Sequence, residues 1–97
     1  MNERNILVVA HARREDTADA ARRVIEELRG AGARPVLAAD DREELAAVDP
    51  LFAGIDVLGD TVDQSDLELA IVLGGDGTIL RAAEIVRGSG APVLGIN

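Results

Sequence analysis

The sequence predicts an α/β protein whose open, mostly parallel sheet is flanked by helices. Three observations support this class: short uninterrupted runs of aliphatic residues, amphipathic segments between them, and a composition in which Phe52 is the only aromatic residue. A core of Val, Leu, Ile and Ala suits parallel strands that are buried on both faces and covered by Ala-rich helices. At 97 residues the chain has the size of one domain.

The first half of the chain has the pattern of a strand–helix–strand unit. Residues 5–10 (NILVVA) are a continuous apolar run, which is typical of a strand buried on both faces. In residues 16–30, apolar side chains recur at three- and four-residue spacing and charged side chains take the other side, which predicts an amphipathic helix. Residues 34–38 (RPVLA) predict a second strand, and such a unit normally forms a right-handed parallel crossover.

The middle of the chain gives weaker signals. Residues 40–44 are mainly acidic, residues 45–48 suit one or two helical turns, residues 55–58 suit a short edge strand, and residues 59–65 suit a loop. We interpret the acidic residues as a solvated face rather than a metal site, because no His and no paired spacing accompanies them.

The second half has the same order of elements around a glycine-rich turn. Residues 67–73 (LELAIVL) predict a buried strand that runs directly into residues 74–78 (GGDGT). Helical spacing resumes over residues 79–86, and residues 92–96 (PVLGI) predict a final strand. The complete order favours an open, Rossmann-like sheet for residues 1–97. With no helix to cover it, the final strand is expected to leave an apolar face exposed.

Composition and charge exclude several classes of function. The chain carries 18 acidic and 10 basic residues, for a formal charge of −8, and every basic residue is Arg. Neither nucleic acid nor an anionic membrane surface is expected as a partner, because both attract basic proteins. The absence of Cys excludes disulfides and thiolate sites. Neither a signal peptide nor a membrane span is predicted, so we expect a soluble, cytoplasmic protein.

The glycine-rich turn at residues 74–78 is the candidate site. A strand that ends in glycines and opens a helix directs backbone N–H groups and the positive end of the helix dipole to one point, which favours phosphate. Gly75 and Gly77 would let the main chain approach a ligand without a Cβ in the way. Thr78 would cap the helix or offer its hydroxyl to a phosphate oxygen. Asp76 has two interpretations: it accepts a proton from an attacking hydroxyl or holds a metal, or it is a turn residue.

Two common phosphate-binding motifs are absent from the chain. It has no G-x-x-x-x-G-K-[ST] sequence, and because it has no Lys that mechanism is not open to it. The turn does not fit G-x-G-x-x-G either, so an ordinary dinucleotide fingerprint is not supported.

The turn and its flanks resemble a known kinase family. Residues 74–78 match the GGDGT signature that NAD kinases share with the diacylglycerol and sphingosine lipid kinases, and phosphofructokinases carry a GGDG(S/T) variant. The stretch ELAIVLGGDGTILRAAE and the later PVLGIN resemble the NAD kinase version, and lipid kinases tend to have an N-G pair that this chain lacks. The opening VVAHARREDTADAARRV is similar to the start of actinobacterial NAD kinases. The resemblance covers nearly the whole chain and is tight from Glu68 to Asn97.

This resemblance implies an activity and roles for site residues. The reaction is transfer of a phosphoryl group from ATP, or from polyphosphate in some members, to the adenosine 2′-hydroxyl of NAD, giving NADP. The resemblance assigns Asp76 as the proton acceptor and Gly77 and Arg81 as contacts to the dinucleotide; Gly75 and Thr78 complete the candidate site. Mg²⁺ is expected as a cofactor, although no ligand set can be named beyond a part for Asp76.

Other interpretations of these residues stay open. Arg81 could instead form a surface ion pair with Glu84, three positions further along the helix. His11 could line the nucleotide pocket or be an ordinary loop residue, and the role of Asn97 is unsettled. The whole chain could also belong to a lipid kinase domain, or to a non-catalytic module that uses nucleotide binding for regulation.

NAD kinases are longer than this chain and have a second, all-β domain. That domain carries an N-D or N-E pair and a T-P-T-G-S-T-A-Y stretch, and neither occurs here. We therefore expect residues 1–97 to be an amino-terminal α/β domain with little or no kinase activity alone. The complete protein is expected to be a homo-oligomer.

Overall fold

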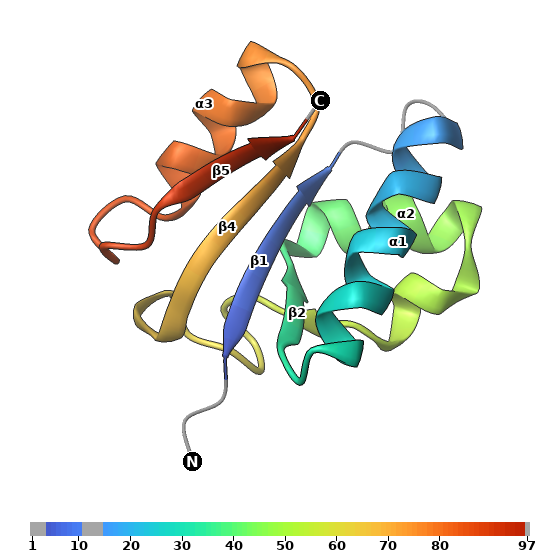
Figure 1. The fold of residues 1–97 in the computed structure, drawn as a ribbon, viewed down its shortest axis with the longest axis horizontal. Helices are drawn as coiled ribbons and strands as arrows, with labels where there is room; N and C mark the ends of the chain where they lie inside the picture. The colour runs from blue at the N-terminus through green and yellow to red at the C-terminus, as the bar shows by residue number, and fades with distance from the viewer. Residues whose placement is uncertain (1–3, 11–14, 97) are drawn as a thin grey trace.

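The computed structural model describes residues 4–10 and 15–96, apart from the side chains of residues 15, 16 and 76 (Figure 1). Its sheet has five parallel strands in the order β3-β2-β1-β4-β5. The strands are β1 (Asn5–Ala10), β2 (Arg34–Leu37), β3 (Asp56–Val57), β4 (Leu67–Leu73) and β5 (Val93–Ile96). The α-helices are α1 (Glu15–Gly30), α2 (Ala39–Val48) and α3 (Asp76–Ile85), and the short 3₁₀ helices are η1 (Pro50–Gly54) and η2 (Gln64–Asp66). The predicted α/β class with an open parallel sheet is confirmed.

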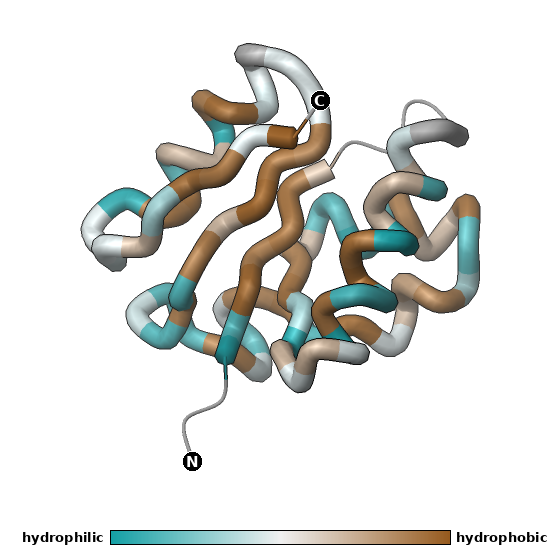
Figure 2. The backbone as a smooth tube through the Cα atoms, viewed as in Figure 1, coloured by the Kyte–Doolittle hydropathy of each residue, from teal (hydrophilic) through white to brown (hydrophobic). Residues whose placement is uncertain are grey.

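Each face of the sheet has its own hydrophobic core. Because side chains alternate along a strand, Val8 and Ala10 of β1 pack with α1, α2 and η1, while Leu7 and Val9 pack with α3 on the other face. Figure 1 shows α1 and α2 gathered beside β1 and β2, with α3 alone beside β4 and β5. Figure 2 shows the central strands as a hydrophobic band between more polar helices and turns. The sole aromatic side chain, Phe52, is fully buried in the core that β1 shares with α1, α2 and η1.

The two longest, mainly apolar strands are the best predicted elements. The expected bounds of β1 and β4 are confirmed at both ends, and the short strand expected within residues 55–58 is β3, at one edge of the sheet. At the other edge, Val93 of β5 packs with α3, whereas Leu94 (51%) and Ile96 (39%) on the other face of the strand are exposed, so the expected exposed apolar face is confirmed. No helix in the described ranges is long and apolar enough to cross a membrane.

Two helices are longer than the sequence pattern predicted. Helix α2 begins at Ala39 rather than within residues 45–48, so it contains the acidic stretch. The interpretation of this stretch as a solvated face is wrong for Asp41, which is buried with 1% of its surface exposed. Helix α3 begins at Asp76 rather than at residue 79, so the last three residues of GGDGT form its first turn.

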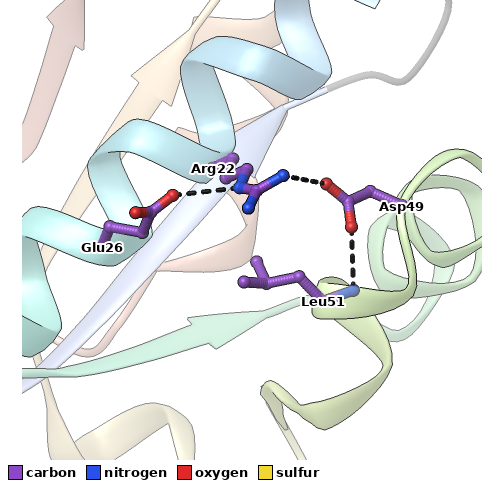
Figure 3. A network of polar contacts seen from close by, with 4 residues as sticks. All are labelled: Arg22, Glu26, Asp49 and Leu51. Carbon is purple, nitrogen blue, oxygen red and sulfur yellow. Dashed lines mark hydrogen bonds and ion pairs between the residues drawn. The ribbon is translucent and has the colours of Figure 1, made fainter.

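A polar network joins α1 to the corner between α2 and η1 (Figure 3). Arg22 donates from Nε to Glu26 at 3.0 Å and from Nη1 to Asp49 at 3.1 Å. The other carboxylate oxygen of Asp49 accepts the N–H of Leu51 at 3.0 Å and so caps η1. The hydrogen bond to Glu26, together with the charge of Asp49, raises the pKa of Arg22 above its ordinary value. This network links the corner between α2 and η1 to helix α1.

Candidate functional site

The candidate site lies at the carboxyl edge of the sheet, where β4 passes into α3. Strand β4 lies between β1 and β5, and all three are parallel, so their carboxyl ends meet at this edge (Figure 1). Gly74 and Gly75 connect the strand to the helix. The first helical hydrogen bonds are those from the N–H groups of Thr78 and Ile79 to the carbonyl of Gly75, at 3.1 and 3.2 Å. The N–H groups before them mark the positive end of the α3 dipole at the same edge.

Gly74 is required by the fold itself. Its φ is +145°, a conformation that residues with a Cβ rarely adopt. A Cβ at this position would also lie 2.8 Å from Oγ1 of Thr78. The sharp turn after β4 therefore requires glycine at position 74 for conformational and steric reasons, whether or not a ligand binds.

Gly75 and Gly77 differ from Gly74 because no contact among the described residues requires them. Neither has a positive φ, and a Cβ built on either residue would meet no atom of the described residues within 4 Å. Gly77 is the second residue of α3, where glycine is less favourable than alanine by about 0.5–1 kcal/mol. Among the described residues, none therefore occupies the space against the backbone at the start of this helix. Such bare backbone suits a ligand that approaches closely, as the sequence analysis expected.

Thr78 does not cap the helix. The N-cap of α3 is Gly75, which has no side chain to cap with, and Thr78 is already the third helical residue. Thr78 is buried at 8% exposure, and its side chain packs under the turn against Gly74. The expectation that Thr78 caps α3 is therefore wrong, because the helix begins two residues before it. Its other expected role, a hydroxyl offered to phosphate, stays a prediction.

Arg81 is paired, but with a partner that the sequence did not suggest. Its Nη1 donates to both carboxylate oxygens of Asp41, at 2.8 and 2.9 Å. The alternative of a surface ion pair between Arg81 and Glu84 is wrong. Oε1 of Glu84 instead lies 3.9 Å from Nη1 of Arg87. The Arg81 side chain is 29% exposed and Asp41 is buried. Helices α2 and α3 follow β2 and β4, so both begin at the carboxyl edge, and this topology was the available signal for the pair.

The remaining candidate residues are placed only in part. Asp76 is the first residue of α3, so its backbone lies at the site, but its side chain is outside the described part of the structure. His11 and Asn97 also lie outside the described residues. Among the described side chains, which do not include those of residues 11–16 and 76, no group of three or more His, Asp or Glu is arranged to hold a metal ion.

A cavity of about 570 Å³ lies elsewhere in the molecule, between α2, η1 and the end of β3. Its lining includes Arg42, Ala53 and Val57, and no residue from the glycine-rich turn or α3. This cavity is therefore separate from the candidate site.

An open parallel sheet in which a strand runs through glycines into a helix defines an α/β protein of the class that binds ligands at the carboxyl edge. Comparison with known families makes the assignment specific. The family described as ATP-NAD kinase N-terminal domain matches residues 6–97, and the chain belongs to this family. This confirms the resemblance given by the GGDGT turn and its flanks.

Similar curated proteins come from actinobacteria and share the name NAD kinase. The relative from Leifsonia xyli is 53% identical over 95 residues, which cover 98% of this chain and 31% of the relative. The relative from Mycolicibacterium paratuberculosis is 44% identical over 105 residues, covering 98% and 33%, and that from Thermobifida fusca is 39% identical over 95 residues, covering 97% and 29%. The chain thus spans about a third of the length of the curated relatives that it matches.

Proposed function

We propose that this chain is the amino-terminal domain of an NAD kinase, an enzyme that transfers a phosphoryl group from ATP or polyphosphate to the adenosine 2′-hydroxyl of NAD. Family membership and the name of the relatives support the reaction. One observation in the structure supports the place of the site: no described residue occupies the space against the backbone of Gly75 and Gly77 at the start of α3. A free glycine backbone at a helix N-terminus suits an anionic phosphate, which its N–H groups and dipole stabilise.

In the proposed mechanism this domain positions the reacting groups and moves one proton. Phosphoryl transfer depends mainly on alignment and on neutralising negative charge. The 2′-oxygen forms a bond to the terminal phosphorus of the donor, and the bond from that phosphorus to the bridging oxygen breaks. The proton of the hydroxyl passes to the carboxylate of Asp76, which stands at the first position of α3. Arg81 supplies a cation one and a half turns further along the same helix.

The described side chains do not include a ligand set for the expected Mg²⁺. No cluster of three possible ligands occurs in the described ranges, and Asp41, the buried acid near the site, is already paired with Arg81. No step of the mechanism is therefore assigned to a metal bound by this domain. Mg²⁺ stays an expectation for the complete enzyme, as does the homo-oligomer, which sedimentation of that enzyme would test.

The proposal is tested in a chimera in which residues 1–97 replace the matching segment of Leifsonia xyli NAD kinase. We expect the chimera to form NADP from NAD with ATP or polyphosphate. Asp76→Asn should lower kcat by about 10²- to 10⁴-fold while NAD binding is largely kept, because only the proton acceptor is lost. Asp60→Asn, which removes an exposed carboxylate after β3, is the matched control and should leave kcat unchanged. Unchanged turnover in Asp76→Asn would refute the proton-acceptor role.

The 97-residue chain alone should form little or no NADP. It spans only about a third of the length of the relatives that carry the name NAD kinase. Measurable NADP formation by the purified chain would show that this domain holds a complete active site.

A further inference from the structure

The Asp41–Arg81 ion pair joins two helices whose starts flank the candidate site. Helices α2 and α3 follow β2 and β4, the two strands on either side of β1. The pair therefore spans the carboxyl end of β1. Asp41 lies in the first turn of α2, where the helix dipole favours a carboxylate, and both of its oxygens accept a hydrogen bond from Nη1 of Arg81.

Burial makes this pair difficult to break. Asp41 is 1% exposed, so its charge has little access to water. A buried carboxylate that loses its only cation is strongly disfavoured, because the cost of desolvation is no longer compensated. Within the described part of the chain, Arg81 is the only cation paired with Asp41. A ligand that arrives at the site must therefore find Arg81 still bound to Asp41.

The paired Arg81 still has donors to offer. Both described hydrogen bonds leave from Nη1, so among the described residues Nε and Nη2 have no partner, and the side chain is 29% exposed. Helical side chains lean towards the helix N-terminus, and residues four apart share a face. Arg81 therefore lies on the same face as Gly77, whose missing side chain leaves open space. An anion seated at the start of α3 would lie within reach of this guanidinium.

We propose that Asp41 is a positioning residue for dinucleotide binding: it fixes Arg81 at the carboxyl edge so that the remaining donors of the guanidinium face the anionic ligand. This inference rests on the proposed function. An unpaired Arg would have to give up rotamer freedom when the ligand binds, whereas the Asp41 contact has already ordered it.

The test measures NAD affinity by calorimetry in the chimera with Leifsonia xyli NAD kinase, and kcat separately. Asp41→Asn keeps the shape of the side chain and removes its charge. We expect the Kd for NAD to rise by about two- to tenfold, the range that corresponds to ordering one flexible side chain, while kcat changes less. Asp40→Asn makes the same change at the exposed neighbouring position and should leave the Kd unchanged. An unchanged Kd in Asp41→Asn would overturn the proposal.

A double-mutant cycle shows whether Asp41 acts through Arg81. If it does, Asp41→Asn will raise the Kd no further once Arg81→Ala is present; additive effects would overturn the proposal. Should Asp41→Asn fail to fold, Asp41→Glu supplies a second test, because it keeps the negative charge but moves the carboxylate that holds Arg81 by one methylene group. A raised Kd with an unchanged Tm supports the proposal, and an unchanged Kd overturns it.

Failure of the inference and failure of the proposed function give different results. A chimera that binds NAD but forms no NADP would refute the kinase proposal, and the Kd comparison would still decide the role of Asp41. A chimera that forms NADP with the same Kd in Asp41→Asn would refute only the positioning role. A chimera that does not bind NAD would refute both.

Discussion

Replacing Gly77 by alanine should stabilise the isolated chain and impair the enzyme. The added Cβ meets no atom of the described residues within 4 Å, and position 77 has a helical conformation that alanine prefers. Alanine is better than glycine inside a helix by about 0.5–1 kcal/mol, so the free energy of unfolding should rise by up to that amount. For a chain of this size the corresponding increase in Tm is about 2–8 °C.

The same methyl group should obstruct the proposed ligand. It would fill the space beside the α3 N-terminus through which phosphate approaches the backbone. We expect the KM for NAD in the chimera to rise by about tenfold, equivalent to about 1.4 kcal/mol of lost binding. Thermal unfolding of the 97-residue chain, followed by circular dichroism, gives the stability, and steady-state NADP formation gives the KM.

Two other glycines make the result interpretable. Gly30→Ala adds a methyl group to open space at the end of α1, far along the chain from the site, and should not change the KM. Gly74→Ala should lower the free energy of unfolding by about 1–3 kcal/mol, because of its φ of +145° and the contact with Thr78. If Gly77→Ala destabilised the chain as Gly74→Ala does, the fold itself would need Gly77 and the argument for a ligand would fail. An unchanged KM would refute it equally.

Two further predictions concern the segment that precedes β4. Gln64 donates from Nε2 to the carbonyls of Ile85 and Arg87 at the end of α3. Gln64→Ala should therefore lower the free energy of unfolding by about 1 kcal/mol. An unchanged Tm would refute this capping role. Hydrogen bonds from the side chain and backbone of Ser65 lower the pKa of Asp63. The ionised carboxylate therefore stabilises the fold at pH values above the pKa that Asp63 has in the unfolded chain. This contribution is lost as the pH falls through the lower pKa of the folded state. Ser65→Ala should raise the Asp63 pKa towards its ordinary value in an NMR titration, and an unmoved pKa would contradict the assignment.

The sequence predicted those elements whose burial leaves a local pattern. Strand β1 is buried along its whole length and β4 over its last four residues, so both are mainly apolar runs with clear ends. Helix α2 was largely missed because it lacks a clear apolar face and begins with the acidic residues Asp40 and Asp41. The glycine turn was found from its residue types alone.

Partners that are distant in the sequence could not be predicted. Asp41 and Arg81 are 40 residues apart, and no periodicity links them. Their contact follows only from the order of the strands, which brings the start of α2 and that of α3 to one edge. The pattern of residues 40–44 indicated charge, and it could not show that one of these charges is buried.

The central position of β1 and β4 in the sheet also determines which backbone hydrogen bonds of the domain open least often. Both strands have hydrogen-bonded neighbours on each side, and all six residues of β1 are buried, whereas β5 is an exposed edge. Amide hydrogens of β1 and β4 should therefore exchange slowest with deuterium, and those of β5 much faster. The GGDGT turn begins where β4 ends, so the segment proposed to hold phosphate is anchored to the part of the domain that opens last. Local opening at the sheet edges can thus occur without moving the start of α3.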